Sequence, residues 1–215
     1  LRQEGFVAYK ANREKMPEDL AASIPYIVEL LKGFNIPILE VDGYEADDVI
    51  GTLSKKAEGA GFFTYMMTPD KDFGQLVSEN IFMYKPARMG NKAEVWGVKE
   101  VCERYGIKRP EQLIDILGLW GDASDNIPGV PGIGEKRAKE LIAEYGSVEN
   151  LLQNTDKLKG KQKENVENFA DQALVSKELA TIILDVPIEV HEDERSERMR
   201  PESTLAVSSA WLASC

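Results

Sequence analysis

Three short groups of acidic residues carry the strongest chemical signal in this chain of 215 residues. They are Glu45, Asp47 and Asp48 in GYEADD, Asp70 and Asp72 in TPDKD, and Asp122 and Asp125 in GDASDN. Like charges a few ångströms apart repel one another unless a cation or a proton lies between them. The grouping therefore points to a Mg²⁺ or Mn²⁺ site of the kind that hydrolyses phosphodiesters.

The spacing within each group predicts that its carboxylates point the same way. Glu45 and Asp48 are three residues apart at the start of a predicted helix, so they lie on one face, with Asp47 beside them in the first turn. Asp70 and Asp72 follow the apolar run GFFTYMM, and at a strand end both side chains leave by the same face. The third group repeats the three-residue spacing in a Gly-containing turn or short helix. One such group alone is typical of a solvated cap or turn, whereas three together favour a metal site.

Helical and strand patterns alternate around the first two groups. In chain order we expect a helix at 17–34, a strand at 36–41, a helix from Tyr44, a strand at 61–68, a short helix from Asp72 and a strand at 80–85. This βαβ rhythm predicts a mostly parallel sheet with helices on both faces. Ligands of such sheets collect at the carboxyl ends of the strands, where the second acidic group falls.

From about Val98 the pattern becomes helical, and it contains the segment GVPGIGEKRAKELIAEYGSVENLL at 129–152. A GxG turn followed by a helix exposes backbone N–H groups that bind a phosphate oxygen directly or through a monovalent cation. The basic residues after the turn supply non-specific attraction to a nucleic acid backbone. The alternative is an ordinary Gly-rich connection between helices with solvated lysines. The candidate DNA-binding residues are Gly132, Gly134, Lys136, Arg137 and Lys139.

Composition excludes several classes of protein. The two cysteines, Cys102 and Cys215, give neither a disulfide framework nor a metal-ligand spacing, so we expect a reducing compartment. No apolar stretch approaches 20 residues, which argues against a membrane span. The net charge of -11 argues at first sight against nucleic acid, but seven negative charges belong to the proposed metal ligands. A single histidine and the lack of a P-loop argue against a serine hydrolase and an ATPase.

The two ends of the sequence are unlike its middle. The chain begins at Leu1 without an initiator Met, and we expect that it is cut from a longer protein. After Val190 a charged run leads into a Ser/Ala-rich tail, and we expect 191–215 to be disordered, with His191 exposed to solvent.

Five strings of the sequence resemble, in order and content, the 5′ nuclease (5′→3′ exonuclease) domain of bacterial DNA polymerase I, in the flap endonuclease superfamily. They are YKANR, GYEADDVIGTL, TPDKDFGQL, GLWGDASDNIPGVPGIGEKRAKELI and LKGKQKENV, and the resemblance covers about residues 1–190. It implies an α/β fold with a PIN-like, mostly parallel sheet flanked by helices. It also implies an all-helical DNA-binding subdomain of the helix-hairpin-helix or helix-3-turn-helix type. The expected parts are 1–97 for the α/β core with an arch remnant, 98–190 for the helical region and 191–215 for the tail.

The resemblance also implies an activity and roles for the residues. The seven carboxylates would hold two Mg²⁺ or Mn²⁺ ions about 3.5–4 Å apart. Lys10 and Arg13 match basic residues of a mobile helical arch that contact the scissile phosphate, and Arg2 lies just before them. Gly132, Gly134 and Lys136 match a region that grips duplex DNA, with K⁺ at the turn. The implied protein is a metal-dependent exonuclease and flap endonuclease of primer removal and repair.

The implied partner is DNA as a 5′ flap, a nick or a branched duplex, including RNA-primed ends. The protein would be a monomer in the bacterial cytoplasm, associated with the nucleoid and not with a membrane.

One departure from the family limits the expected activity. Members of the family carry further aspartates upstream, in an opening strand and just before the arch, and this chain starts after both. We therefore expect weak or no turnover from this fragment. One alternative function is a non-catalytic DNA-junction binder that keeps only the helix-hairpin-helix module. Another is a PIN-type ribonuclease, against which the Gly-rich and basic segment at 129–163 argues.

Overall fold

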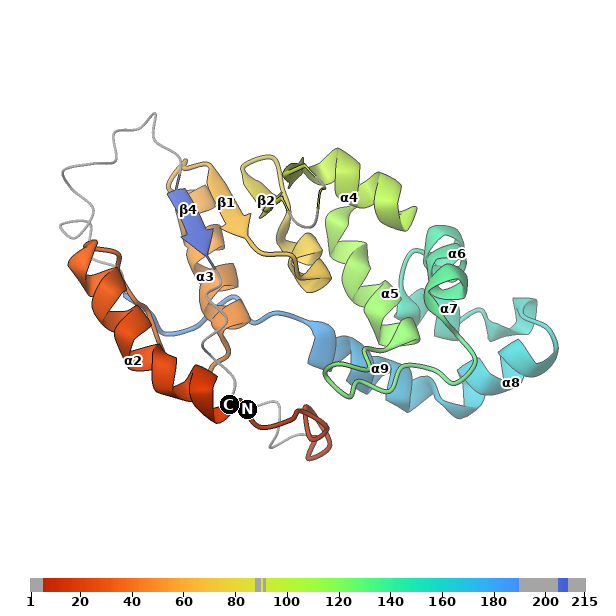
Figure 1. The fold of residues 1–215 in the computed structure, drawn as a ribbon. Helices are drawn as coiled ribbons and strands as arrows, with labels where there is room; N and C mark the ends of the chain where they lie inside the picture. The colour runs from red at the N-terminus through yellow and green to blue at the C-terminus, as the bar shows by residue number, and fades with distance from the viewer. Residues whose placement is uncertain (1–5, 88–89, 91, 190–204, 209–215) are drawn as a thin grey trace.

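A computed structural model of the chain describes residues 6–87, 90, 92–189 and 205–208. An α/β half extends to strand β3 (Glu94–Trp96), and a helical half begins directly afterwards at α4 (Val98–Tyr105). The two halves lie side by side, so that the molecule is elongated (Figure 1). In the part of the chain that is described, no helix combines the length and apolar character that a membrane crossing requires.

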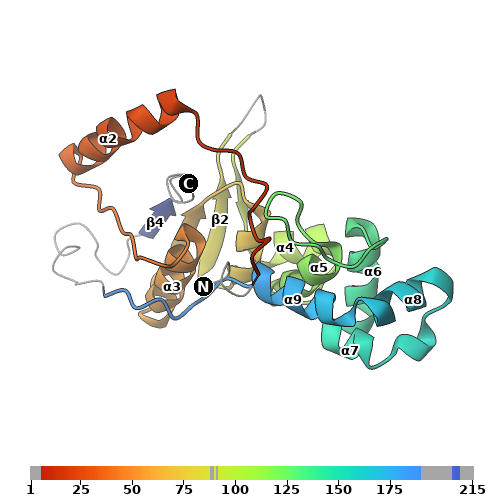
Figure 2. The same cartoon turned by 90° about the horizontal axis from the view of Figure 1, so that it is seen from below.

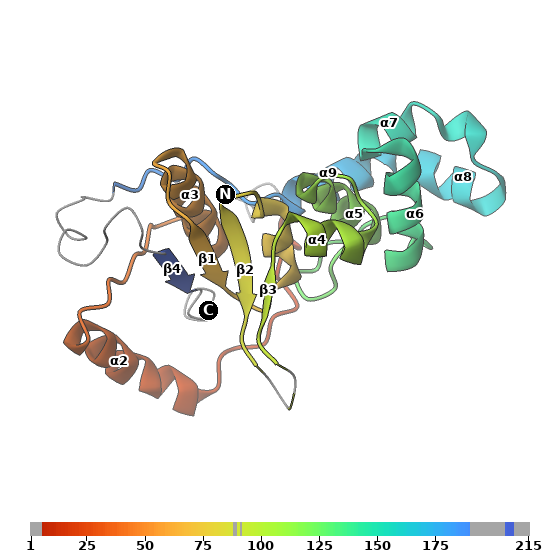
Figure 3. The ribbon, with the colours of Figure 1, turned by 90° about the horizontal axis from the view of Figure 1, so that it is seen from above.

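The sheet of the α/β half has four strands in the order β3-β2-β1-β4. Its other members are β1 (Thr64–Met67), β2 (Ile81–Lys85) and β4 (Leu205–Ser208). Strands β2 and β4 run parallel to β1, and β3 runs antiparallel to β2 (Figure 3). The predicted mostly parallel sheet is therefore confirmed. The sequence does not predict β3, because three residues are too few to show an alternating pattern.

One face of the sheet is buried, because side chains alternate between the two faces of a strand. Thr64 and Met66 of β1, and Ile81 and Met83 of β2, are almost completely shielded from solvent. The apolar members of this set belong to the main hydrophobic core, which also includes Ile50. Burial of this face therefore fixes the position of β1. The position of its end, where the chain reaches the second acidic group, is fixed with it.

Two helical elements flank the strand β1 in the sequence and pack near it. Helix α3 (Ala46–Gly59) begins after Glu45, as the sequence predicts. The 3-10 helix η1 (Lys71–Leu76) follows β1 and buries Phe73 and Leu76. The predicted short helix is thus present, although it begins one residue before Asp72. Both elements start at the acidic groups, so their buried residues position the carboxylates.

Helix α2 (Glu18–Gly33) is also present as predicted, but it buries none of its residues. It contains Pro25, and several of its apolar residues face solvent, with Leu30 61% exposed and Phe34 just after it 73% exposed. Figure 2 shows α2 at the end of the molecule opposite the helices α6 (Glu135–Tyr145), α7 (Val148–Leu152) and α8 (Gly160–Asn168). This helix takes no part in the core that positions the acidic residues.

One expectation about a strand is wrong. The segment 36–41 was a candidate strand, but it has no regular structure, and Ile36 is 49% and Ile38 43% exposed. An apolar run becomes a strand only where a partner offers backbone hydrogen bonds, and no strand pairs with this one among the described residues. Within the tail 191–215, which the sequence predicts to be disordered, the structure describes only β4, and its backbone pairs with β1. The other residues of the tail, including His191, lie outside the described residues.

The predicted helical region is confirmed from α4 onward. Besides α4, α6, α7 and α8, the helical half contains η2 (Pro110–Gln112), α5 (Leu113–Trp120), η3 (Thr155–Lys157) and α9 (Ala170–Ala180). Helix α5 is the centre of this half, because Leu113, Ile116, Leu117 and Leu119 are all buried. It packs against α6 and α9, and the third acidic group follows directly at its C-terminal end.

Two glycines bring the backbone after α5 against the backbone before α6. Gly121 has φ 78° and Gly129 has φ 60°, which is the left-handed region that favours glycine. A Cβ atom on Gly129 would lie 2.5 Å from the backbone nitrogen of Gly121, and one on Gly121 would lie 2.8 Å from that of Gly129. Any larger side chain at either position would force the two segments apart. We call this contact the glycine crossing.

Candidate functional site

The three acidic groups lie where the predicted elements begin or end. The first is at the N-terminal end of α3, and the second follows β1 and opens η1. The third lies in a turn closed by two backbone hydrogen bonds, from Asp122 N to Ile127 O at 2.9 Å and from Ile127 N to Asp122 O at 2.8 Å. Of the two possibilities for this group, a turn and a short helix, the structure has the turn.

The N-terminal segment 6–13 is hydrogen-bonded to this turn. Lys10 N donates to Asp125 O at 2.9 Å. Asn12 Nδ2 donates to Ala123 O at 2.8 Å, and in the reverse direction Asn126 Nδ2 donates to Ala8 O at 2.6 Å. These bonds connect residues more than 100 positions apart in the sequence, and they place the basic residues of the segment beside the carboxylates.

Lys10 and Arg13 form ion pairs with the first and third acidic groups. Lys10 Nζ lies 2.5 Å from Glu45 Oε2 and 3.7 Å from Asp125 Oδ2, and its side chain is only 7% exposed. Arg13 Nη2 lies 2.7 Å from Asp125 Oδ1. The structure thus brings both predicted phosphate-contacting residues to the acidic cluster. Arg2, the third basic residue of this region, lies outside the described residues.

Lys71 is a further residue of the site that the sequence reasoning missed. Its Nζ atom donates a hydrogen bond to Asp122 Oδ2 and lies 3.6 Å from Asp72 Oδ1. Burial lowers the pKa of Lys71, but the charges of Asp72 and Asp122 outweigh it, so that the pKa lies above its usual value. The signal was present in TPDKD, where a lysine stands between two aspartates.

Asp72 is the least satisfied carboxylate in the cluster. Burial, and next the negative charge of Asp70, raise its pKa to about 7, and Lys71 only partly offsets them. Its Oδ1 atom is buried without a hydrogen-bond partner among the described residues. Asp47 behaves similarly, since burial and then the charge of Asp70 raise its pKa to about 6. The acidic groups therefore act on one another across the site, and both carboxylates favour a cation nearby.

Other carboxylates of the set are engaged with the backbone. Asp48 is 1% exposed, and it accepts hydrogen bonds from Ile183 N at 2.9 Å and from Glu45 N at 3.2 Å. It connects the start of α3 to the segment after α9, which is a structural role that spacing alone did not indicate. Asp70 Oδ1 accepts from Asp72 N at 3.1 Å and caps η1. The hydrogen bonds of Asp48 and Asp70 fix the backbone at the starts of α3 and η1, and they thereby position the neighbouring carboxylates.

The third acidic group has one oxygen occupied locally. Asp122 Oδ1 accepts hydrogen bonds from Ser124 N at 2.8 Å and Ser124 Oγ at 2.5 Å. Burial raises the pKa of Asp122, but the hydrogen bonds from Lys71 and Ser124 outweigh it, so that the pKa lies below its usual value. The site therefore stabilises the ionised form of Asp122 and destabilises the ionised form of Asp72.

The donor atoms of these residues suit a divalent metal ion, but the distances between the residues suit it less well. Among the described residues, no group of three or more acidic, histidine or cysteine side chains is close enough to surround one metal ion. However, the donors are all oxygen, and one buried oxygen of Asp72 has no hydrogen-bond partner. Mg²⁺ keeps several waters and is commonly bound through only one or two carboxylates. The donor set therefore suits a hydrated hard cation.

The Gly-rich turn before α6 has the predicted form. Gly132 has φ 80°, and α6 starts directly after Gly134. The turn is fixed from outside, because Asn165 Nδ2 donates to Pro131 O at 2.7 Å, and a Cβ on Gly132 would lie 3.1 Å from the same Nδ2. The first N–H groups of α6 face outward from a turn with little steric bulk, as anion binding at a helix N-terminus requires.

The three basic residues of α6 differ in their contacts. Arg137 donates to Glu140 Oε2 at 2.7 Å and to Gln162 Oε1 at 2.6 Å. Lys139 donates to Glu135 Oε1 at 2.5 Å. Lys136 is exposed. All three lie at the surface of the first turns of α6, but two of them are partly neutralised by acidic or amide neighbours.

Comparisons with known proteins agree with this arrangement of two halves. The family model described as the 5′-3′ exonuclease, N-terminal resolvase-like domain, matches residues 1–106. A second model, described as the 5′-3′ exonuclease, C-terminal SAM fold, matches residues 108–203. Together they cover almost the whole chain.

A curated relative and two solved structures are similar to the chain. DNA polymerase I of Bacillus subtilis is 47% identical over 191 residues, which are 88% of this chain and 22% of the relative. The chain thus spans about a fifth of that protein. A structure of T5 5′-exonuclease with bound zinc is 25% identical, with a TM-score of 0.69, and the match covers 83% of this chain and 69% of that one.

The T5 D15 flap endonuclease, solved as a complex with DNA and metal ions, is 24% identical with a TM-score of 0.67. That match covers 83% of this chain and 68% of the T5 chain, and at this identity it supports the fold. The two family models, the extent of the Bacillus match and the shared fold agree with one another. The chain is therefore a member of the 5′-3′ exonuclease family, with matches to both the resolvase-like domain and the SAM fold.

Proposed function

We propose that this chain hydrolyses DNA phosphodiesters at 5′ flaps and nicks with the help of two divalent metal ions, Mg²⁺ or Mn²⁺, as the 5′ nuclease part of a DNA polymerase I. The residues 1–97 carry most of the metal-binding carboxylates, and 98–190 add Asp122 and Asp125 and grip the duplex. In this role the protein is a bacterial enzyme of primer removal and repair that acts as a monomer.

The buried oxygen of Asp72 is the observation that carries the proposal. It has no hydrogen-bond partner among the described residues, and the neighbouring carboxylates Asp70 and Asp122 add negative charge around it. Lys71 Nζ lies 3.6 Å from this oxygen and is shared with Asp122, so the ion pair compensates only part of the buried negative charge. Buried charge that is not fully compensated costs several kcal/mol. Such a site is stabilised by a cation from outside the chain. The T5 relatives with bound metal ions support this interpretation.

The roles of the residues follow from their positions. Bound metal would supply an activated water and stabilise the leaving oxygen. The residues that would hold it are the seven carboxylates Glu45, Asp47, Asp48, Asp70, Asp72, Asp122 and Asp125. Asp48 would in addition fix the start of α3 through its hydrogen bonds to the backbone. Lys10 and Arg13 would bind the scissile phosphate, since both cations already lie at the acidic cluster and can exchange a carboxylate for a phosphate oxygen.

The helical half supplies the second part of the proposed function. The N-terminal end of α6, with Gly132, Gly134 and Lys136, would bind a backbone phosphate of the duplex, either directly or through K⁺. Arg137 and Lys139 would add charge attraction. The glycine crossing closes the turn of Asp122 only a few residues before this turn, so the duplex would lie next to the acidic cluster.

A second candidate function is a DNA-junction binder without catalysis. It is favoured by one specific observation: among the described residues, no three potential ligands are close enough to surround a metal ion. Lysines that pair with the carboxylates would then be permanent counter-ions. In that case the helical half would bind DNA by itself, and the acidic cluster would have only a structural role.

The experiment that tests the proposal is cleavage of a 5′-labelled flap duplex by the full chain in Mg²⁺, in Mn²⁺ and in EDTA. We expect cutting at the junction in either metal and none in EDTA. Asp72→Asn should slow the cutting about a thousandfold, since metal stabilisation of the transition state is worth several kcal/mol. The matched control is Asp171→Asn, the same change at an exposed position of α9, which should cut like the wild type.

The outcome separates the two candidates. Flap binding without cutting in either metal would contradict the nuclease proposal and favour the junction binder. A flap with an RNA 5′ end, tested beside an all-DNA flap, shows whether primers are included among the substrates. Sedimentation of the chain with the flap would test the monomer.

A further inference from the structure

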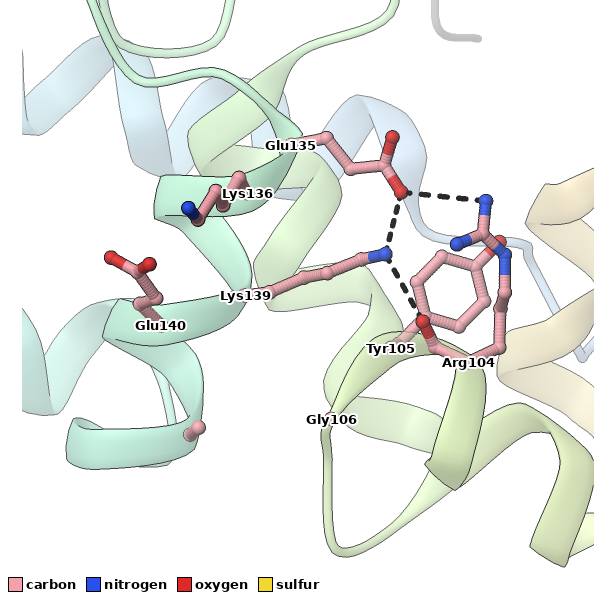
Figure 4. A pocket seen from close by; sticks show the side chains of 8 residues that line it. Arg104, Tyr105, Gly106, Glu135, Lys136, Lys139 and Glu140 are labelled. Atoms are coloured by element: carbon pink, nitrogen blue, oxygen red, sulfur yellow. Dashed lines mark hydrogen bonds and ion pairs between the residues drawn. The ribbon is translucent and has the colours of Figure 1, made fainter.

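A surface pocket lies between the C-terminal end of α4 and the first turns of α6 (Figure 4). Its volume is about 510 Å³, which is within the usual range for pockets that bind a small ligand. Arg104, Tyr105 and Gly106 line it from α4, and Glu135, Lys136 and Lys139 line it from α6. None of the roles proposed above uses Arg104 or the α4 side of this pocket.

Two cations of the pocket share a single carboxylate. Lys139 Nζ lies 2.5 Å from Glu135 Oε1, and Arg104 Nη2 lies 3.7 Å from the same oxygen. Lys136 adds a third positive charge, whereas Glu140, also on the rim, pairs with Arg137 outside the pocket at 2.7 Å. The pocket therefore has an excess of positive charge in a chain whose net charge is -11.

An aromatic ring holds the two cations in place. Tyr105 is 4% exposed, and the Nζ atom of Lys139 lies 4.9 Å from its ring centroid, with the guanidinium of Arg104 at 5.8 Å. Lys139 Nζ also donates to Arg104 O at 3.1 Å, which links the two helices. Cations fixed over an aromatic face lose little conformational freedom when an anion binds. Figure 4 shows these contacts converging on one side of the pocket.

Charges of the acidic cluster act on residues that line the pocket. Burial raises the pKa of Tyr105, and Arg104, Lys71 and Asp72 are among the charges that act on it. The charge of Lys71 also acts on Glu135. A nucleic acid strand that is bound at the acidic cluster and at the start of α6 would therefore pass within electrostatic reach of this pocket.

We propose that the pocket is a DNA-backbone subsite, in which Arg104 and Lys139 bind one phosphodiester and its sugar fits against the stem of Lys136. The inference rests on the proposed function, because it requires DNA as the substrate. Arg104 exchanges the long contact with Glu135 for a phosphate oxygen, and its planar guanidinium suits a phosphate better than an ammonium does. The subsite extends the DNA contact of the helical half from α6 to α4.

The salt dependence of binding tests the subsite. Binding of the full chain to a flap duplex is measured in Ca²⁺ or EDTA between 50 and 300 mM salt, for wild type, Arg104→Gln and Lys139→Gln. Loss of one phosphate contact should lower the slope of log K against log salt by about 0.9 and weaken binding about five- to tenfold near 0.1 M salt. The matched control is Lys99→Gln, which removes one charge from the same helix at a side chain that is 77% exposed.

A second experiment identifies which phosphate of the strand the subsite binds. Neutral methylphosphonates are placed one at a time along the strand, and for one position Arg104→Gln should cause no further loss of affinity. Equal slopes for Arg104→Gln, Lys99→Gln and wild type would overturn the subsite. So would an Arg104→Gln effect that no methylphosphonate removes. The proposed function fails in a different way, because then the wild type itself does not cut the flap in either metal, whatever the salt slopes of the variants.

Discussion

Two lysines of this protein each bridge a pair of carboxylates, one in the helical half and one in the acidic cluster. Lys177 lies 2.5 Å from Asp115 Oδ1 and 2.8 Å from Glu149 Oε1. Asp115 Oδ1 also accepts a hydrogen bond from Val148 N at 2.9 Å, so this set joins α5, α7 and α9. Lys71 bridges Asp72 and Asp122 in the same manner.

The difference between the two sets lies in what surrounds them. The set around Lys177 has two carboxylates served by a lysine and a backbone N–H, and it connects three helices. The set around Lys71 has a buried oxygen of Asp72 without a hydrogen-bond partner, and Asp70 and Asp125 add repulsion to it. A lysine between carboxylates is therefore not informative alone. What marks the candidate site is negative charge that the described residues do not neutralise.

The first prediction breaks the set in the helical half. Lys177→Met should lower the free energy of unfolding by about 3 kcal/mol, because it leaves Asp115, only 9% exposed, as a buried charge without its cation. The measurement is urea unfolding at neutral pH. Lys163→Met is the control, since Lys163 pairs with Glu167 on the surface at 3.7 Å, and the expected loss there is below about 0.5 kcal/mol. Equal losses in both variants would show that the buried set has no special role.

The second prediction compares one isosteric change in the two sets. Asp115→Asn should destabilise the protein by about 2 kcal/mol, because a charged hydrogen bond to Lys177 is lost. Asp72→Asn should stabilise the metal-free protein by about 1 kcal/mol, because it replaces a carboxylate whose ionised form is destabilised by burial and by Asp70 with a neutral amide. Thermal unfolding in EDTA at pH 7.5 measures both. A destabilising effect of the same size at Asp72 would contradict the distinction between the sets.

The third prediction concerns rescue by metal. Lys71→Met should lower the free energy of unfolding in EDTA by about 1 kcal/mol, since the carboxylates lose their cation. Millimolar Mg²⁺ should restore the loss, because ligand that binds only the folded state stabilises it. Lys177→Met should show no such restoration, and it serves as the control in the same melting series. Failure of both Mg²⁺ and Mn²⁺ to raise the melting temperature of Lys71→Met would argue against a metal at this cluster.

The fourth and smallest effect is a pH dependence in the helical half. Burial raises the pKa of Glu149, but the hydrogen bond from Lys177 outweighs it, so the pKa lies below its usual value. A depressed acid contributes stability above its unfolded pKa, near 4.3, and that contribution is lost as the pH falls through the folded pKa. Since Glu149 is half-exposed, the contribution is about 0.5 kcal/mol. Urea unfolding of wild type and Glu149→Gln should differ at pH 7 and converge near pH 3. A constant difference would contradict the assignment.

The sequence predicts the elements that have their own periodic pattern or end signals. The helices α2 and α3, the strands β1 and β2 and the turn before α6 are confirmed in type and approximate position. The segment 36–41 shows the limit of such reasoning. Its apolar residues are those of a strand, but whether a strand forms depends on a partner distant in sequence. The same dependence explains β4, whose four residues pair with β1 from far along the chain.

Spacing selects the carboxylates of the site but not their individual contacts. Asp48 and Asp47 are adjacent and of the same type, yet one bonds to the backbone of Ile183 and the other is destabilised as an anion by burial and Asp70. That difference arises from the direction of each side chain after folding. The assignment of the seven residues as metal ligands stays a prediction, as do the DNA contacts of α6.

The glycine crossing has a consequence for where a bound strand would be cut. It closes the turn of Asp122 at its base, backbone against backbone, without a side chain that could lengthen or rotate, and the turn that opens α6 follows within a few residues. In the proposed function, the distance between the acidic cluster and the duplex-binding turn is therefore set by backbone geometry. The cleavage position would then lie a constant number of nucleotides from the duplex-binding turn. Point substitutions elsewhere in the site would change how fast the enzyme cuts and leave unchanged where it cuts.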